Sequence, residues 1–187
     1  WAEPGQAFAF ASPSFVVDQE GKGLLGKPER DYRWVNRQTM DCAWATAEAK
    51  ACLTRAHAGW YHIPLDCVWG FEQIDNDEST SELCSTITPF GTFKSKKLPM
   101  GVKQGPAIYQ HFQDTAFENE YKPNGDKLCL VFFDDTWTGD DTIEEAFVTL
   151  VRLLTVARKY GIQYRLVELA LAGGGAVAAK GTRSTFS

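Results

Sequence analysis

The sequence predicts an α+β fold in which helices cover one side of an antiparallel sheet. Strand-like and helix-like segments alternate along the chain, and two stretches are typical of β-hairpins. The chain has 187 residues, of which 44% are hydrophobic, so it can bury a core. Its length fits one large domain or two small lobes.

The first half of the chain contributes two strands, one helix and one hairpin to this prediction. Residues 14–18 (SFVVD) are typical of a short strand, and residues 60–66 (WYHIPLD) of a strand that runs into an aspartate. Residues 45–58 contain good helix formers and are followed by Gly59, which suits a helix C-cap. Residues 82–95 (ELCSTITPFGTFKS) predict a hairpin.

The second half predicts two helices and a second hairpin. Residues 105–121 repeat apolar side chains at the helical period, and residues 127–133 (KLCLVFF) predict a buried strand with TWT (136–138) as its hairpin partner. Residues 142–160 form the clearest helix, because Thr142 and Glu145 match a capping box. The apolar face that we expect this helix to bury consists of Ile143, Phe147, Leu150, Leu154 and Ala157.

Composition excludes several classes of protein. No stretch approaches the roughly 18 apolar residues that span a bilayer, and the start resembles no signal peptide, so we expect an intracellular, non-secreted protein. The five cysteines form no CxxC pair and predict buried free thiols in a reducing compartment. Because the net charge is −5, any affinity for nucleic acid must come from a local patch. The missing initiator Met predicts a fragment of something longer.

Two Asp-Asp pairs lie six residues apart in LVFFDDTWTGDD. Asp140 and Asp141 directly precede a predicted helix, where carboxylates accept hydrogen bonds from free backbone amides. Asp134 and Asp135 are harder to explain, since a two-residue hairpin turn favours Asn-Gly or Asp-Gly. Adjacent carboxylates raise one another's pKa unless a cation intervenes. An ordinary turn and a Mg²⁺ or Mn²⁺ site both remain open for this pair.

The order of several further segments resembles reverse transcriptases, closest to the gypsy-class LTR retrotransposon and retroviral branch. SPSFVVD and DYRWVN resemble the fingers strands, and LDCVWGFEQI resembles the first catalytic motif, LDxxxGYxQI. TPFGTFKSKKLPMGVKQGPAIYQ resembles YGxYEFxxMPFGLxxAPAxFQ and the retroviral LPQGWKGSPAIFQ, and FFDD stands where the family has Tyr-x-Asp-Asp. The resemblance runs from about residue 12 to 166.

This resemblance implies a palm-and-fingers polymerase fold, an antiparallel sheet backed by helices, with the thumb absent. The small-residue segment 171–187 has little to bury, so its composition predicts a disordered tail. The resemblance divides the rest of the chain into an N-terminal extension (1–11), partial fingers (12–58) and a palm (59–170) with a fingers hairpin and basic run within 81–104. It implies an RNA-directed DNA polymerase in which Asp66, Asp134, Asp135 and the backbone carbonyl of Cys67 bind two Mg²⁺ ions, with Mn²⁺ as a substitute.

The resemblance also assigns binding roles. Phe71 aligns with the aromatic gate that excludes a ribose 2′-hydroxyl, and Lys22, Lys27 and Met100 align near the incoming nucleotide. The residues expected at the template and primer are Asp31, Arg33, Lys94, Lys96, Lys97, Gly101 and Lys103. The implied partners are an RNA or DNA template with its primer, dNTPs, and the thumb and RNase H regions of a longer polyprotein, in a cytoplasmic retroelement particle or the nucleus.

The sequence departs from the family pattern at both ends. Pro28 and Glu29 are expected to interrupt a fingers strand because proline cannot donate to a ladder. After Tyr164 the family's KxxKC ending is missing. We therefore expect feeble or undetectable polymerase activity from this chain alone, because an acidic palm without a thumb binds a duplex weakly. Two alternatives stay open: a catalytically silent relic that only binds nucleic acid or protein, and a metal phosphohydrolase.

Overall fold

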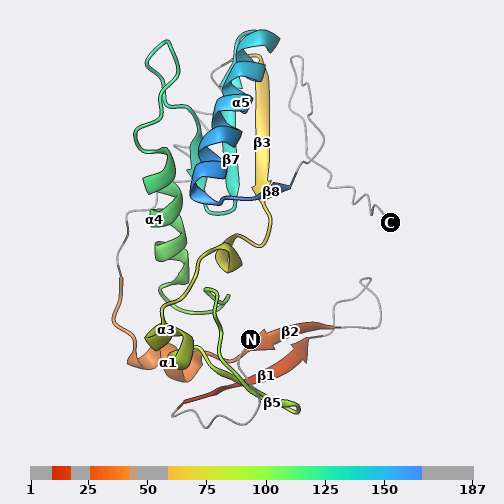
Figure 1. Cartoon of the computed structure of the whole chain (residues 1–187), viewed down its shortest axis with the longest axis vertical. Coiled ribbons are helices and arrows are strands. Elements are labelled where there is room, and N and C mark those ends of the chain that lie inside the picture. Colours follow the sequence, from red (N-terminus) through yellow and green to blue (C-terminus); the bar gives the residue numbers. More distant parts are fainter. Residues whose placement is uncertain (1–9, 18–25, 43, 45–58, 166–187) are drawn as a thin grey trace.

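The chain folds into two four-stranded sheets with helices beside each (Figure 1). The computed structural model describes residues 10–17, 26–42, 44 and 59–165, and the predicted helix at 45–58 lies outside them. The β1 sheet has the order β2-β1-β4-β5 and the β3 sheet the order β6-β7-β3-β8. The strands of the β1 sheet are β1 (Ser12–Val17), β2 (Lys27–Arg30), β4 (Thr86–Thr88) and β5 (Gly91–Phe93). Those of the β3 sheet are β3 (Tyr61–Cys67), β6 (Leu130–Phe132), β7 (Asp135–Asp140) and β8 (Tyr164–Arg165).

The longer helices accompany the β3 sheet, and the short ones lie near the β1 sheet (Figure 1). The helices are α1 (Arg33–Gln38), the 3-10 helix η1 (Gly70–Gln73), α3 (Glu78–Leu83), α4 (Gly105–Phe117) and α5 (Ile143–Tyr160). Helix α5 begins with the predicted capping box, in which Thr142 and Glu145 bond each other's backbone amides, and it ends at Gly161 in the left-handed conformation. Among the described residues, no helix is both long and apolar enough to cross a membrane.

The β3 sheet is covered on one face, which confirms the predicted α+β class. Every second residue of β3 (Ile63, Leu65 and Cys67) is buried in a core shared with α4 and α5. Because side chains alternate across a strand, the intervening residues, including Asp66, belong to the opposite face. The described strands of this sheet are all antiparallel to their neighbours, as predicted.

The β1 sheet corrects two sequence-based predictions. The DYRWVN segment does not form a fingers strand: α1 begins at Arg33, whose backbone amide donates to the Asp31 carboxylate (3.0 Å). Pro28 does not interrupt β2, because β2 is an edge strand that needs no donor on its outer side. The predicted hairpin at 82–95 is confirmed as β4 and β5, although its first residues belong to α3.

The predicted buried face of α5 is wrong in part. Ile143, Phe147 and Leu154 are exposed, with Phe147 at 66%, whereas Ala146, Thr149, Leu153, Val156 and Ala157 are buried. The helix carries apolar residues on more than one face, so periodicity alone selected the wrong stripe.

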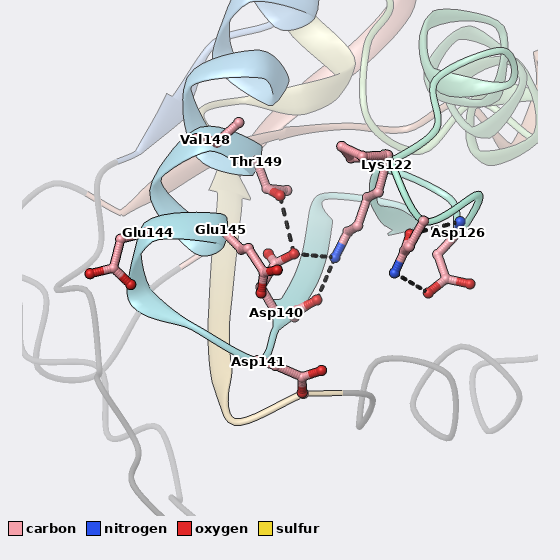
Figure 2. A pocket seen from close by; sticks show the side chains of 12 residues that line it. Lys122, Asp126, Asp140, Asp141, Glu144, Glu145, Val148 and Thr149 are labelled. Carbon is pink, nitrogen blue, oxygen red and sulfur yellow. Dashed lines mark hydrogen bonds and ion pairs between the residues drawn. The ribbon is translucent and has the colours of Figure 1, made fainter.

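A buried ion pair fixes the end of β7 opposite its turn (Figure 2). Lys122 Nζ lies 2.9 Å from Asp140 Oδ1, and both side chains are less than a tenth exposed. Lys122 also donates to the Gly139 carbonyl, and Thr149 Oγ1 donates to Asp140 Oδ1 (3.2 Å). Asp140 therefore does not cap α5 as predicted, because Thr142 takes that role. The pair lines a cavity of about 370 Å³ between the loop before β6 and the start of α5.

Substitution Lys122→Met is expected to destabilise the chain strongly. It would leave the Asp140 carboxylate buried without a cation, a change that typically costs about 3–5 kcal/mol. Lys127→Met, at an exposed lysine five residues later in the segment before β6, serves as the control. Thermal unfolding measures both variants. An unfolding midpoint for Lys122→Met equal to that of the control would contradict this account of the pair.

Candidate active site

Strand register brings Asp66 and Asp135 directly opposite one another. Strands β3 and β7 pair antiparallel from Tyr61 opposite Asp140 to Asp66 opposite Asp135. Directly opposed side chains emerge on the same face of a sheet with Cβ atoms about 4.5–5.5 Å apart. Two of the three predicted catalytic carboxylates therefore meet on the face that the helices do not cover.

Asp134 completes the predicted trio from the turn between β6 and β7. Phe132 pairs with Asp135, so the two turn residues are Phe133 and Asp134, one position earlier than an Asp-Asp turn would place them. Phe133 adopts φ 51°, the left-handed value that hairpin turns require at a central position and that bulky side chains rarely take. The side chain of Gln110 in α4 holds this turn by accepting from the Phe133 amide (2.9 Å).

The electrostatics of the site are those of crowded carboxylates. The pKa of Asp134 is raised by burial, then by the charge of Asp66 and of Asp135. The pKa of Asp135 is raised by burial and by the charge of Asp66. Such an arrangement disfavours three simultaneous negative charges unless a cation joins them.

Arg165 is a cation that contacts one of the three carboxylates. It lies next to Asp66 on β8, and its Nη1 is 3.6 Å from Asp66 Oδ2. Both side chains are more than a third exposed, so this contact is weak and easily exchanged. Sequence reasoning missed Arg165 because no family motif was recognised after Tyr164, where the KxxKC ending is missing.

A strained connection follows the Asp66 end of β3. Trp69 takes φ 51°, and η1 then begins at Gly70. The side chain of Gln73 fastens η1 to β8: its Nε2 donates to the Gln163 carbonyl (2.9 Å), and its Oε1 accepts from the Gln163 amide (3.0 Å). Gln73 belongs to the motif LDCVWGFEQI, so its position in that motif was the available signal.

The predicted gate residue Phe71 lies in η1, directly after Gly70. Its ring stacks on Tyr109 of α4, with centroids 5.1 Å apart and planes inclined by 25°. A Cβ at Gly105 would approach the Phe71 ring to 3.3 Å, so glycine there leaves room for the ring. The structure thus places Phe71 five residues after Asp66, with its ring supported by Tyr109.

The predicted template turn is held by an amide that the sequence analysis did not single out. Gly101 has φ +91°, and its carbonyl accepts from Asn36 Nδ2 (2.9 Å). Asn36 Oδ1 accepts from the Lys103 amide (2.8 Å), so α1 clamps both sides of the turn. Met100, at the same turn, is 41% exposed.

Most of the predicted phosphate-contacting cations form ion pairs in this structure. Lys94 pairs with Glu78 and Glu82 of α3 and its side chain is only 10% exposed, which indicates a packing role. Lys97 pairs with Asp75 (2.7 Å) and Lys103 with Asp41 (2.5 Å). Lys96 is exposed, and with Lys94 and Lys97 it lines a cavity of about 520 Å³ between β2 and the segment after β5.

The remaining predicted residues lie in or near the β1 sheet. Asp31 and Arg33 form a bidentate pair, which lowers the pKa of Asp31 to about 2. Lys27 begins β2, and Lys22 lies outside the described residues. The four cysteines in the described part are free thiols, as predicted, and Cys42 is the exposed one among them.

The site is suited to a divalent cation by chemistry but is not closed around one. Carboxylate oxygens are the ligands that Mg²⁺ and Mn²⁺ prefer, and Asp66, Asp134 and Asp135 supply them from the ends of β3 and β7 and the β6–β7 turn. Within the described ranges, however, no group of three His, Cys, Asp or Glu side chains is arranged to hold a metal ion. The donor set fits, and the carboxylates would have to draw together on binding.

Comparison with known proteins identifies the family. The chain matches the model described as "Reverse transcriptase (RNA-dependent DNA polymerase)" over residues 25–166. The chain belongs to the reverse transcriptase family. The sequence-based recognition is thus confirmed at family level.

Similar proteins include enzymatic polyproteins of plant viruses. The chain is 29% identical over 153 residues to that of Figwort mosaic virus, and 26% identical to those of Cauliflower mosaic virus (strain D/H) and Carnation etched ring virus. Each match covers 81% of this chain but only 22–23% of the polyprotein, so the chain spans under a quarter of these relatives.

Solved foamy virus structures share the fold. The chain superimposes with a TM-score of 0.74 on the foamy viral protease-reverse transcriptase in complex with an RNA/DNA hybrid, and with 0.73 on the same enzyme in complex with dsDNA. Both matches are 18% identical and cover 85% of this chain, and 20% and 32% of those chains. The predicted fingers-and-palm architecture is confirmed at the level of the fold.

Substitution Asp135→Asn is expected to stabilise the metal-free protein at neutral pH. A carboxyl whose pKa is raised by folding destabilises the native state as pH rises from the ordinary value of 3.8 toward the folded value, and this cost persists above it. We expect the unfolding midpoint in EDTA to rise by about 1–2 °C at pH 7, since solvent screens a half-exposed group. The gain should vanish below pH 3.8. Asp141→Asn is the control. An unfolding midpoint of Asp135→Asn below that of the wild type at pH 7 would contradict the raised pKa of Asp135.

Proposed function

We propose that this chain is the RNA-directed DNA polymerase domain of a longer polyprotein, and that it transfers nucleotides from dNTPs to a primer 3′-hydroxyl. The observation that carries the proposal is the register that sets Asp66 against Asp135 beside the Asp134 turn. Family membership and the shared fold support it. The assignment to the gypsy-class or retroviral branch, and the division into fingers and palm at the predicted boundaries, belong to the same proposal.

Asp66, Asp134 and Asp135 would hold two divalent cations, Mg²⁺ or Mn²⁺, with the Cys67 carbonyl as a further ligand. When bound, such ions activate the primer hydroxyl and neutralise charge on the departing pyrophosphate. The protein's own task is to gather the carboxylates on an uncovered sheet face. Arg165, which contacts Asp66 in the metal-free chain, would release that carboxylate when a cation binds.

The other residues around the trio would position the nucleic acid and the nucleotide. Phe71 would exclude the ribose 2′-hydroxyl, because its ring is fixed by stacking on Tyr109. Gly101 presents backbone without a side chain, so a template could approach it closely. The solved complexes of the foamy viral enzyme with an RNA/DNA hybrid and with dsDNA support the proposal that a primed template is the partner here. Further binding surface would come from the thumb and RNase H regions of the polyprotein.

A catalytically silent relic is the second candidate. It is favoured by the open arrangement of the carboxylates in the described chain and by the Arg165 contact on Asp66. In that case, the site would bind no divalent cation at physiological concentration, and the chain would at most bind nucleic acid passively.

Binding of Mn²⁺ separates these two candidates. We expect electron paramagnetic resonance to detect Mn²⁺ bound to the full chain, and Asp134→Asn to weaken that binding by roughly tenfold or more, since it removes one charged ligand. Asp126→Asn, at an exposed carboxylate on the loop before β6, should bind as the wild type does. Equal and negligible binding in all three proteins would favour the relic.

Substitution Phe71→Val should relax sugar discrimination. Single-nucleotide addition to a primed homopolymer with Mn²⁺ would measure the ratio of dNTP to rNTP use, which we expect to fall by about tenfold or more when the ring is removed. Phe90→Val, at a side chain 86% exposed on the β4–β5 hairpin, is the matched control. An unchanged ratio in Phe71→Val would remove the gate assignment.

A further inference from the structure

The buried phenol of Tyr109 carries a polar group into the centre of the site. Its side chain is completely buried in α4, and Gln113, one turn later, donates from Nε2 to the Tyr109 hydroxyl at 2.7 Å. Because the hydroxyl oxygen already accepts this bond, its proton is directed toward another acceptor. A buried hydroxyl without an acceptor is costly, so the neighbourhood should supply one.

Two acceptors lie within reach of that proton. Asp134 Oδ1 is buried and makes no hydrogen bond of ordinary geometry among the described residues, yet contact with the Tyr109 hydroxyl is one influence that lowers the pKa of Asp134. A Cβ built at Gly70 would fall within 3.0 Å of both Asp134 Oδ1 and the Tyr109 hydroxyl, so the two oxygens flank the same point in space. The other acceptor is the Cys67 thiol, which already receives a bond from Gln113 Nε2 (3.2 Å). A carboxylate is a far better acceptor than a thiol.

We propose that Tyr109 is a positioning residue: its hydroxyl donates a hydrogen bond to Asp134 Oδ1 while its ring supports Phe71. The single buried side chain of Tyr109 would then set both the orientation of the Asp134 carboxylate and the position of the Phe71 ring. With Oδ1 held toward Tyr109, the second oxygen of Asp134 is left for a cation shared with Asp66 and Asp135. The metal-related part of this inference rests on the proposed function.

Tyr109 has two separable roles in this proposal: its hydroxyl donates a hydrogen bond, and its ring supports Phe71. The reverse transcriptase patterns that GPAIYQ resembles, APAxFQ and SPAIFQ, carry phenylalanine at this position, so the hydroxyl is a feature of this chain. Tyr109→Phe keeps the ring and its stack on Phe71, whose centroid lies 5.1 Å away, and removes only the donor. Tyr109→Leu removes both. Gly70 is also explained, because any larger residue would push the two oxygens apart.

The hydrogen bond can be tested without any metal. A double-mutant cycle of Tyr109→Phe and Asp134→Ala, read by urea unfolding of the full chain in EDTA, should show a coupling of about tenfold in the unfolding equilibrium constant. A parallel cycle of Tyr109→Phe with Cys67→Ala should show a much smaller coupling. No coupling to Asp134, or a larger one to Cys67, would overturn the proposal, whether or not the chain binds metal.

The positioning role is tested by Mn²⁺ affinity and by sugar discrimination together. Tyr109→Phe should weaken Mn²⁺ binding by roughly threefold to tenfold, because the carboxylate loses its orientation, and should leave the ratio of dNTP to rNTP use unchanged. Tyr109→Leu should lower both. Wild-type affinity in Tyr109→Phe would overturn the positioning role. A wild-type chain that binds no Mn²⁺ would instead count against the proposed function, and the metal-free cycle would still decide the hydrogen bond.

Discussion

The antiparallel register of β3 and β7 is the constraint on which the site depends. A slip of one residue would turn Asp66 toward the helices, because side chains alternate between the two faces of a strand. The register is fixed from the covered face, where Thr136 and Thr138 are buried and bonded to the Tyr164 hydroxyl and the Leu128 carbonyl. Asp66 and Asp135 repel each other at one end of β7. The buried Lys122–Asp140 pair holds the other end of the strand and so offsets this repulsion.

Neutral side-chain amides hold the segments around the carboxylates. Gln110 bonds the backbone of the β6–β7 turn, Gln113 bonds Tyr109 and Cys67, and Gln73 joins η1 to β8. Asn36 does the same for the turn at Gly101. Amides can donate and accept at once without adding a charge, so they fix backbone conformations such as φ 51° at Phe133 and leave the negative potential of the carboxylates available for cations.

The parts of the site that depend on short motifs and on their order along the chain could be predicted from the sequence. The parts that depend on contacts between distant segments could not. The placement of Asp66 next to Asp135 was implied by the resemblance to reverse transcriptases, and the α5 capping box followed from Thr142 and Glu145. The sequence did not reveal the ion pairs of the basic run, because the carboxylates that hold Lys94 come from α3, 12 and 16 residues earlier. The β2 edge position that tolerates Pro28 depends on sheet order, and the support of Phe71 by Tyr109 depends on helix packing; neither is encoded in a short motif.

The pairing of β3 with β7 brings together carboxylates that repel each other, and the proposed nucleotide transfer depends on that pairing. Anomalous diffraction from crystals of the full chain grown with Mn²⁺ and a dNTP tests this most directly. The account requires manganese peaks bound jointly by side chains of both β3 and the β6–β7 turn. A structure that shows manganese only elsewhere on the surface, with Asp66 still on Arg165, would contradict it.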